Sequence, residues 1–407
     1  MTLRFLHAAD IHLDSPLRGL DSEEAAPAGR IRNATRRALG RLVDLAINED
    51  VALVLIAGDI YDGDWPDYRT GIFFAQQMAR LTQAGRQVIA IRGNHDAENK
   101  MTRSLRLPEG VRLLDHRRPE TVELASLGVA VHGQSFATQE VTENLARGYP
   151  PAVAGLLNIG MLHTCLEQTG GVHRRYAACT RADLESLGYD YWALGHIHAR
   201  EVVSENPWIV FPGNLQGRHI NEPGEKGATL VTVADGRVVA AEHRVLDDFR
   251  WARVTADLTG CNSEAAALQA VAALLSDALA AADGRGLAVR VTLAGATALH
   301  GALAGLPEKL RAEARVLSEF LWVEAVEQRT RPAAESALAE RGDALGALAR
   351  RIAALADAPG ENLLGDWPAQ LLNRLPQGAL PEGHAIHDPA RLLARARDLL
   401  LARLEEG

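Results

Sequence analysis

Five apolar runs of strand length in the first 200 residues each end in side chains that can bind a metal ion or carry a proton. Between the runs, apolar residues recur at helical spacing, as at positions 39, 42, 43 and 46. Strands that alternate with helices predict an α/β sheet covered by helices. Sites in such sheets form outside the carboxyl ends of the strands, so the closing residues are expected to share one edge. They are Asp10, His12, Asp59, Asn94, His95, Asp96, His163, His196 and His198.

The pattern changes twice along the 407 residues. From about 201 to 245 it is rich in β structure, and we expect a second sheet that packs on the first within one domain, 1–245. Residues 246–330 alternate between strand and helix again and predict a small α/β domain. Residues 331–407 have helical patterns, with helices expected at 333–356, 361–373 and 389–404.

Composition narrows the class of protein. Hydrophobic residues make up 47% of the chain, and no apolar run approaches the length of a membrane helix. The three cysteines are scattered and lack a CxxC spacing, so disulfides and a zinc knuckle are not expected. These features predict a cytoplasmic protein without a membrane segment. The net charge of −9 argues against strong DNA binding by this chain alone.

Each polar residue at the end of an apolar run also has an ordinary structural explanation, since Gly-Asp and Gly-Asn pairs form turns and a single His is often a packing residue. Five such endings in one α/β pattern instead favour a metal site. Nitrogen and oxygen ligands without thiolate suit Mn²⁺, Fe²⁺ or Zn²⁺ better than Mg²⁺. The set exceeds the needs of one ion and predicts two ions that share a carboxylate and clamp a phosphoryl group. Gly58 and Gly93 would let the backbone turn sharply beneath the two ions.

The motifs "DIH", "GDIYD", "GNHD", "LHT" and "GHIH" resemble those of the calcineurin-like metallophosphoesterase superfamily. With "LHAADIHLDSPL" and "FPGNLQGRHINE", the chain is more narrowly similar to the SbcD-type DNA repair exonucleases, in their YhaO-like branch. The motifs cover residues 7 to about 222. This resemblance implies a four-layer α/β/β/α sandwich in which residues 246–330 form a small α/β capping domain, followed by a helical C-terminal region.

The resemblance also implies a role for each closing residue. One ion would be held by Asp10, His12, Asp59 and His198. The other would be held by Asp59, Asn94, His163 and His196, with Asp59 as the bridge. His95 would act on the scissile phosphate, and Asp96 would orient His95. Some archaeal and eukaryotic nuclease relatives have a His three residues after the bridging Asp, whereas this chain has Asp62 there.

Three residues are weaker candidates for substrate contacts. Arg92 precedes "GNHD", and Arg103 lies in an arginine-rich stretch at 99–118 whose alternative role is a solvated surface. His219 follows a Pro-Gly turn that, by resemblance, packs beside the "GHIH" loop. We expect His7 to be a core or outer-sphere residue, and His132 to have a loop role.

The resemblance implies a DNA repair nuclease with two divalent ions, of which Mn²⁺ is the expected one and Fe²⁺ or Zn²⁺ are alternatives. It would be a 3′-directed exonuclease with single-strand endonuclease activity that hydrolyses phosphodiesters through a metal-bridging water. The alternatives are a metallophosphodiesterase for a small nucleotide or other small phosphoester, and a scaffold with a structural metal site. The implied partners are DNA, an SMC-like coiled-coil ATPase of the SbcC type that docks on the C-terminal helices, and a second copy in a homodimer.

Overall fold

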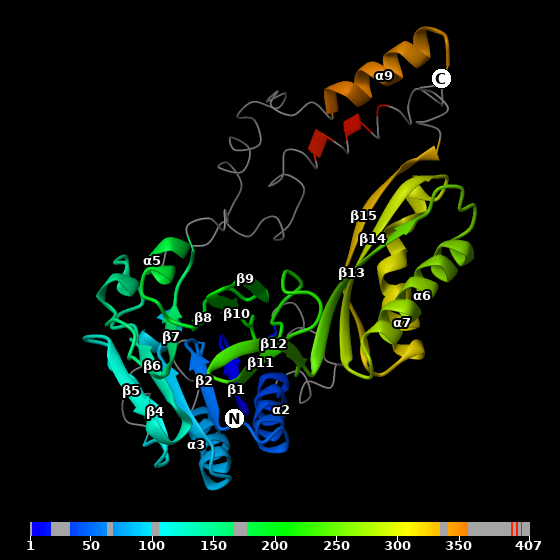
Figure 1. Cartoon of the computed structure of the whole chain (residues 1–407). Helices are drawn as coiled ribbons and strands as arrows, with labels where there is room; N and C mark the ends of the chain where they lie inside the picture. The colour runs from blue at the N-terminus through cyan, green and yellow to red at the C-terminus, as the bar shows by residue number, and fades with distance from the viewer. Residues whose placement is uncertain are drawn as a thin grey trace. The chain divides into compact units, whose positions relative to one another are not determined.

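The structure is a computed structural model that describes residues 2–17, 33–62, 68–98, 106–166, 177–333 and 341–356, with five further residues at 392, 393, 396, 397 and 400. The chain forms two compact units. The first consists of Met1–Ala252 and Ala282–Ala288, and the second of Arg253–Ala281 and Val289–Gly407. Figure 1 traces both.

Two six-stranded sheets form the first unit. One has the order β12-β11-β1-β2-β3-β4 and consists of β1 (Thr2–Ala8), β2 (Leu53–Ala57), β3 (Gln87–Ile91), β4 (Val111–Leu113), β11 (Gly227–Ala234) and β12 (Arg237–Val245). The other has the order β5-β6-β7-β8-β10-β9 and consists of β5 (Glu120–Leu124), β6 (Val129–Gly133), β7 (Leu157–His163), β8 (Tyr191–Gly195), β9 (Glu201–Glu205) and β10 (Trp208–Phe211). Strands β1 to β4 are mutually parallel, as are β6, β7, β8 and β10. The closing residues of these strands therefore lie at the carboxyl edges of the two sheets.

Alternation along the buried strands produces the layers. In β2, Leu53 and Leu55 join the core between the sheets, whereas Val54 and Ile56 join the core beneath α2 (Ala34–Asn48) and α3 (Arg69–Gln83). On the outer face of the second sheet, Leu184 of α5 (Arg181–Glu185) packs in a third cluster. Figure 1 shows α2 and α3 together on one side of this unit and α5 on the other. The expected α/β/β/α sandwich is confirmed, although α5 makes its outermost layer thin.

The second unit is a small α/β structure. Its sheet has the order β13-β14-β15, with β13 (Phe249–Asp257), β14 (Gly286–Thr297) and β15 (Leu321–Pro332), and the helices α6 (Glu264–Ala281) and α7 (Leu306–Leu317) connect the strands. The first residues of β13 and β14 belong to the first unit. Helix α6 has the length and apolar composition of a membrane-crossing helix, unlike the sequence-based expectation that no segment would. Its buried residues are Ala267, Val271 and Leu275, at the spacing of one helix face.

The prediction of one continuous helix over 333–356 is wrong. Residues 341–343 are not helical, and α9 spans Ala344–Ala356. The break has a local cause, because Asp343 Oδ1 accepts the backbone N–H of Gly346 at 3.0 Å and so satisfies a donor of the first helical turn. The helix expected at 361–373 and most of the one at 389–404 lie outside the described residues.

Candidate metal centre

The predicted ligands lie on strained backbone just past the ends of the strands. Positive φ angles occur at Asp10 (51°), His12 (43°), Asp59 (50°) and His196 (98°). The left-handed region costs a non-glycine residue of the order of 1–3 kcal/mol, and such residues persist only where the surroundings impose them. Their concentration at this edge indicates that the fold holds these side chains at a cost in stability.

Glycines permit the close approach of these strand ends. A Cβ at Gly93 would lie 2.2 Å from Asp59 Oδ1, and one at Gly58, where φ is 92°, would lie 2.4 Å from His163 Nδ1. The expectation that Gly58 and Gly93 leave room for the site is therefore confirmed. Gly195 has the same property and was not predicted: a Cβ there would lie 2.0 Å from Ala57 O, where β8 passes β2.

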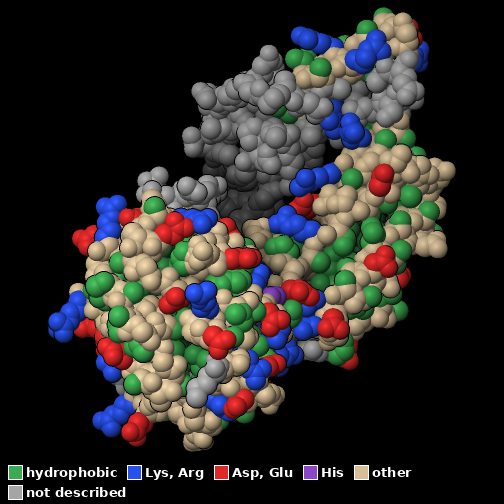
Figure 2. All heavy atoms as spheres, in the orientation of Figure 1, with side chains coloured by type: hydrophobic (Ala, Val, Ile, Leu, Met, Phe, Trp, Pro, Cys, Tyr) green, Lys and Arg blue, Asp and Glu red, His purple; other side chains and the backbone are tan. Residues whose placement is uncertain are grey.

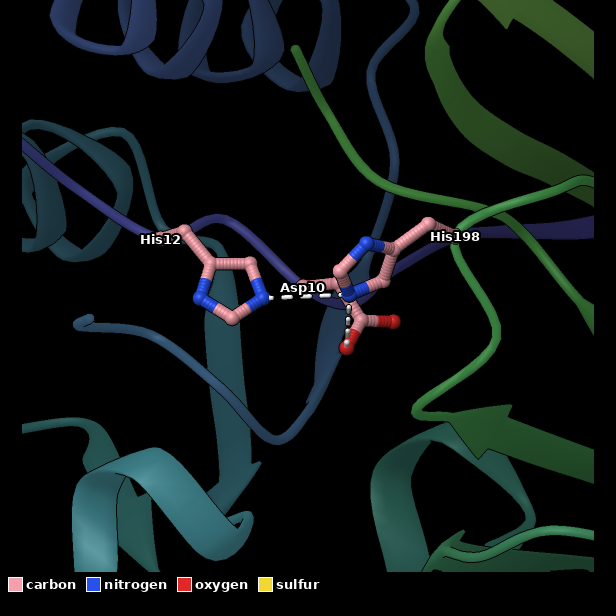
Figure 3. Close-up of side chains that lie close together, drawn as sticks. All are labelled: Asp10, His12 and His198. Atoms are coloured by element: carbon pink, nitrogen blue, oxygen red, sulfur yellow. Dashed lines mark hydrogen bonds and ion pairs between the residues drawn. The ribbon is translucent and has the colours of Figure 1, made fainter. Parts of the chain in front are cut away.

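Three side chains converge in the part of the cluster that Figure 3 shows. His12 Nε2 lies 3.2 Å from His198 Nε2, and His198 Nε2 lies 3.8 Å from Asp10 Oδ1. Two imidazole nitrogens that face each other beside a carboxylate are an arrangement that a shared cation stabilises.

A second group adjoins the first. His163 Nε2 lies 3.1 Å from Asn94 Oδ1 and 3.4 Å from Asp59 Oδ2. The His196 ring centre is 5.3 Å from that of His163. Asp59 Oδ2 also lies 3.8 Å from His12 Nε2, so one carboxylate oxygen faces nitrogens of both predicted ligand sets. The structure thus brings all seven predicted ligands together, and their role as ligands stays a prediction.

Neighbouring acceptors fix the orientation of the histidines. His163 Nδ1 donates to Ala57 O at 3.0 Å, which directs Nε2 at the oxygens of Asn94 and Asp59. His198 Nδ1 lies 2.6 Å from Glu222 Oε1, so its Nε2 likewise faces the cluster. The backbone N–H of His196 donates to both oxygens of Asp10, at 3.1 and 3.0 Å. Histidines held through one nitrogen, with the other directed at oxygen ligands, fit divalent transition metals.

The electrostatics favour neutral imidazole at His12 and a charged carboxylate at Asp59. Burial, together with the Arg218 guanidinium, lowers the pKa of His12 to about 3, so the ring is neutral at neutral pH and one of its two nitrogens offers a lone pair. Burial opposes the ionisation of Asp59, but the adjacent His163 outweighs it and holds the pKa of Asp59 below its ordinary value. Neutral imidazole and carboxylate are the forms that bind metal ions.

The carboxylate next to His95 is not the one that was predicted. Asp96 was expected to orient His95, but its carboxylate accepts the backbone N–H groups of Ile60, Tyr61 and Gly93 at 2.9–3.1 Å. It therefore shapes the turn. The carboxylate beside His95 is Asp62, whose Oδ1 lies 3.2 Å from His95 Nδ1 and 3.3 Å from His12 Nδ1. The physical reason is the short helix α4 (Asn94–Glu98), in which consecutive side chains point in different directions.

A cleft of about 990 Å³ opens onto these residues. The predicted ligands on its wall are Asp59, Asn94, His196 and His198, and His95 lines it too. Arg218, Glu222 and Lys226 also line it, and sequence reasoning missed all three. A signal existed, since "GRHINEPGEK" holds four charged residues after the turn that was expected to pack beside the "GHIH" loop.

The three weaker candidates for substrate contacts, Arg92, Arg103 and His219, differ in where they lie. His219 lines the cleft, with its Nε2 at 3.4 Å from Glu222 Oε1. Arg92 is not among the residues on the cleft wall, and Arg103 lies outside the described residues. His7 and His132 are buried, and each bonds through both ring nitrogens to groups of the sandwich: Tyr191 Oη and Leu194 O for His7, and Thr121 Oγ1 and Asn158 Oδ1 for His132.

Comparison with known families agrees with this geometry. Residues 3–200 match the calcineurin-like phosphoesterase family, and residues 251–331 match the middle domain of the metallophosphoesterase YhaO. The chain belongs to the calcineurin-like metallophosphoesterase superfamily.

Individual relatives refine this placement. The chain is 36% identical over 273 residues to the uncharacterized metallophosphoesterase YhaO of Bacillus subtilis, an alignment that covers 66% of each chain. It is 26% identical over 249 residues to the DNA double-strand break repair protein Mre11 of Sulfurisphaera tokodaii, covering 56% of this chain and 59% of that protein. The Mre11 protein of Sulfolobus acidocaldarius is 24% identical over 250 residues, covering 57% and 61%. The chain thus spans about three fifths to two thirds of the length of these relatives.

Proposed function

We propose that this protein is a two-metal-dependent DNA nuclease, a 3′-directed exonuclease with single-strand endonuclease activity. The observation that carries the proposal is the convergence of seven nitrogen- and oxygen-bearing side chains close to His95, four of which line the same cleft as His95. Similarity to proteins named for DNA double-strand break repair supports DNA as the substrate.

The proposed reaction needs two sets of metal ligands, which share Asp59. Asp10, His12, Asp59 and His198 would hold one ion, and Asp59, Asn94, His163 and His196 the other. When bound, two divalent ions, Mn²⁺ by our proposal, would neutralise phosphate charge and lower the pKa of a water nucleophile.

His95 has the features of a proton donor to the leaving oxygen. The Asp62 carboxylate at its Nδ1 raises the pKa of His95 and so favours the protonated ring. Its side chain is 36% exposed, so it can meet a substrate in the cleft. A positioned general acid of this kind contributes about 10²–10⁴-fold to the rate.

A small phosphoester is the second candidate substrate. Among the described residues of the cleft wall, Arg218 and Lys226 are the Arg and Lys side chains, and the net charge is −9. Both features suit a small substrate better than a long polyanion bound by this chain alone.

Purified protein with Mn²⁺ tests the proposal on linear DNA and on bis-p-nitrophenyl phosphate. We expect both to be cleaved, and His95→Ala to lower kcat by at least about 10²-fold while metal analysis still finds two ions per chain. An Asn94→Ala variant is the matched control and should lose metal. Cleavage of the small ester without any DNA substrate would favour the second candidate, and metal loss in His95→Ala would place His95 among the ligands.

We also propose that the protein works in the cytoplasm, as a homodimer, with an SMC-like coiled-coil ATPase that docks on residues 386–407. The acidic chain supports this, because such a partner would supply a DNA-binding surface. Deleting 386–407 should weaken co-purification with the ATPase. Unchanged association would remove this segment from the interface.

A further inference from the structure

Arg218 lies in the wall of the cleft between two carboxylates. Its Nη1 is 3.2 Å from Asp62 Oδ1, and its Nη2 is 3.4 Å from Glu222 Oε1. Only 12% of the side chain is exposed, although the residue lines the same cleft as His95. Because Asp62 contacts both His95 and Arg218 through one oxygen, the guanidinium lies beside the predicted proton donor.

The backbone around Arg218 is held from several sides. Its own N–H donates to Glu222 Oε2 at 2.7 Å, and Trp251 Nε1 donates to Gly217 O at 3.0 Å. Gln216 Nε2 donates to Phe249 O at 2.6 Å. An arginine fixed in this way loses little conformational entropy when it binds a ligand.

The guanidinium has more donors than the protein uses. It carries five N–H groups, and the two carboxylates account for two. His198 Nδ1, at 3.3 Å from Nη2, donates its own hydrogen to Glu222 and cannot accept another. The other charged amine on the cleft wall, Lys226, donates to His198 O at 3.0 Å. Arg218 is therefore a cation that has spare donors and shares the Asp62 carboxylate with His95.

We propose that Arg218 binds a non-bridging oxygen of the substrate phosphate, beside the point where His95 acts. The inference rests on the proposed function, since it assigns a substrate contact to the same site. A planar guanidinium matches phosphate oxygens in geometry as well as in charge. The competing explanation is that Arg218 only neutralises Asp62 and Glu222.

Binding of inorganic phosphate to the Mn²⁺-loaded full chain, measured by calorimetry together with metal content, tests the proposal. Arg218→Gln should weaken phosphate binding at least about tenfold at unchanged metal content, and Arg218→Lys should weaken it less. In turnover of bis-p-nitrophenyl phosphate, Arg218→Gln should raise KM. The matched control is Arg147→Gln, because Arg147 is 74% exposed and pairs with Asp183, which does not line the cleft; it should behave as the wild type.

Asp62→Asn separates direct from indirect action. It removes an ion-pair partner of Arg218 but leaves the guanidinium in place, so phosphate binding should change less than in Arg218→Gln. Equal losses in both variants, or unchanged phosphate binding in Arg218→Gln, would overturn the proposal. If Arg218→Gln loses metal, Arg218→Lys decides: full metal with weakened phosphate binding supports the proposal, and wild-type binding overturns it.

Failure of the proposed function is distinguishable, because phosphate binding requires no turnover. A wild-type protein that binds phosphate through Arg218 but cleaves no phosphodiester would contradict the nuclease and leave the Arg218 contact standing.

Discussion

At the scale of single residues, the carboxylate of Asp62 contacts three residues of the candidate site. Asp62 Oδ1 lies within 3.3 Å of His95, His12 and Arg218, and Ser15 Oγ donates to its other oxygen at 2.7 Å. Asp62 therefore connects the predicted proton donor, a predicted ligand and the arginine.

Asp62→Asn and Asp96→Asn should separate chemistry from folding. Asp62→Asn removes the charge beside His95 and should lower kcat about 10- to 100-fold, with little change in melting temperature. Asp96→Asn replaces an acceptor of three backbone N–H groups and should lower the free energy of unfolding by about 1–3 kcal/mol. Steady-state kinetics and thermal melts distinguish the two, and a reversed pattern would restore Asp96 as the partner of His95.

His7 should make stability depend on pH. Burial lowers its pKa from 6.5 to about 3, so in this interval the unfolded chain binds a proton that the folded chain excludes. Stability contributed by neutral His7 is present above pH 6.5 and is lost as pH falls, at about 1.4 kcal/mol per pH unit.

Urea unfolding in EDTA at pH 7 and pH 5 measures this effect. The wild type should lose about 2 kcal/mol more than His7→Gln between the two values. Equal losses in both proteins would show that His7 does not exclude the proton.

At the scale of elements, glycines differ in how closely a neighbouring side chain packs against them. Gly40 lies inside α2 with nothing within 4 Å of a built Cβ, whereas a Cβ at Gly160 in β7 would lie 2.4 Å from the Trp192 ring. Gly40→Ala should raise the free energy of unfolding by about 0.5–1 kcal/mol. Gly160→Ala should lower it by about 1–3 kcal/mol through overpacking. Chemical denaturation measures both, and stabilisation by Gly160→Ala would contradict the packing of β7 against β8.

The elements also show how far sequence reasoning reaches. Strand β3 coincides with one of the five apolar runs, which is bounded by Arg86 and Arg92. The convergence of the seven candidate ligands could be predicted because the polar residue that closes a parallel strand has a position fixed by topology. Asp62, Arg218 and Glu222 were missed because they lie in connecting segments, where contacts depend on how the chain folds back and not on local periodicity.

At the scale of the whole molecule, charge limits what the chain binds unaided. Figure 2 shows Lys and Arg side chains interspersed with Asp and Glu on the visible face of the first unit. The net charge of −9 adds long-range repulsion toward a polyanion.

DNA binding by the isolated chain should therefore be weak and only modestly dependent on salt. With Arg218 and Lys226 as the Arg and Lys side chains of the described cleft wall, the slope of log K against log salt should be no steeper than about −3. Titrations of labelled DNA at several salt concentrations measure it. A slope near −8 would reveal an extended basic surface and remove the reason to expect a DNA-binding partner.

The left-handed backbone at Asp10, His12, Asp59 and His196 has a consequence for the evolution of the chain. Replacing any of them with glycine would relieve strain and tend to stabilise the metal-free protein, while it removes a predicted ligand. Selection for heat resistance alone would thus favour variants that have lost the candidate metal centre. A thermostability screen without an activity requirement should drift toward inert proteins at these four positions.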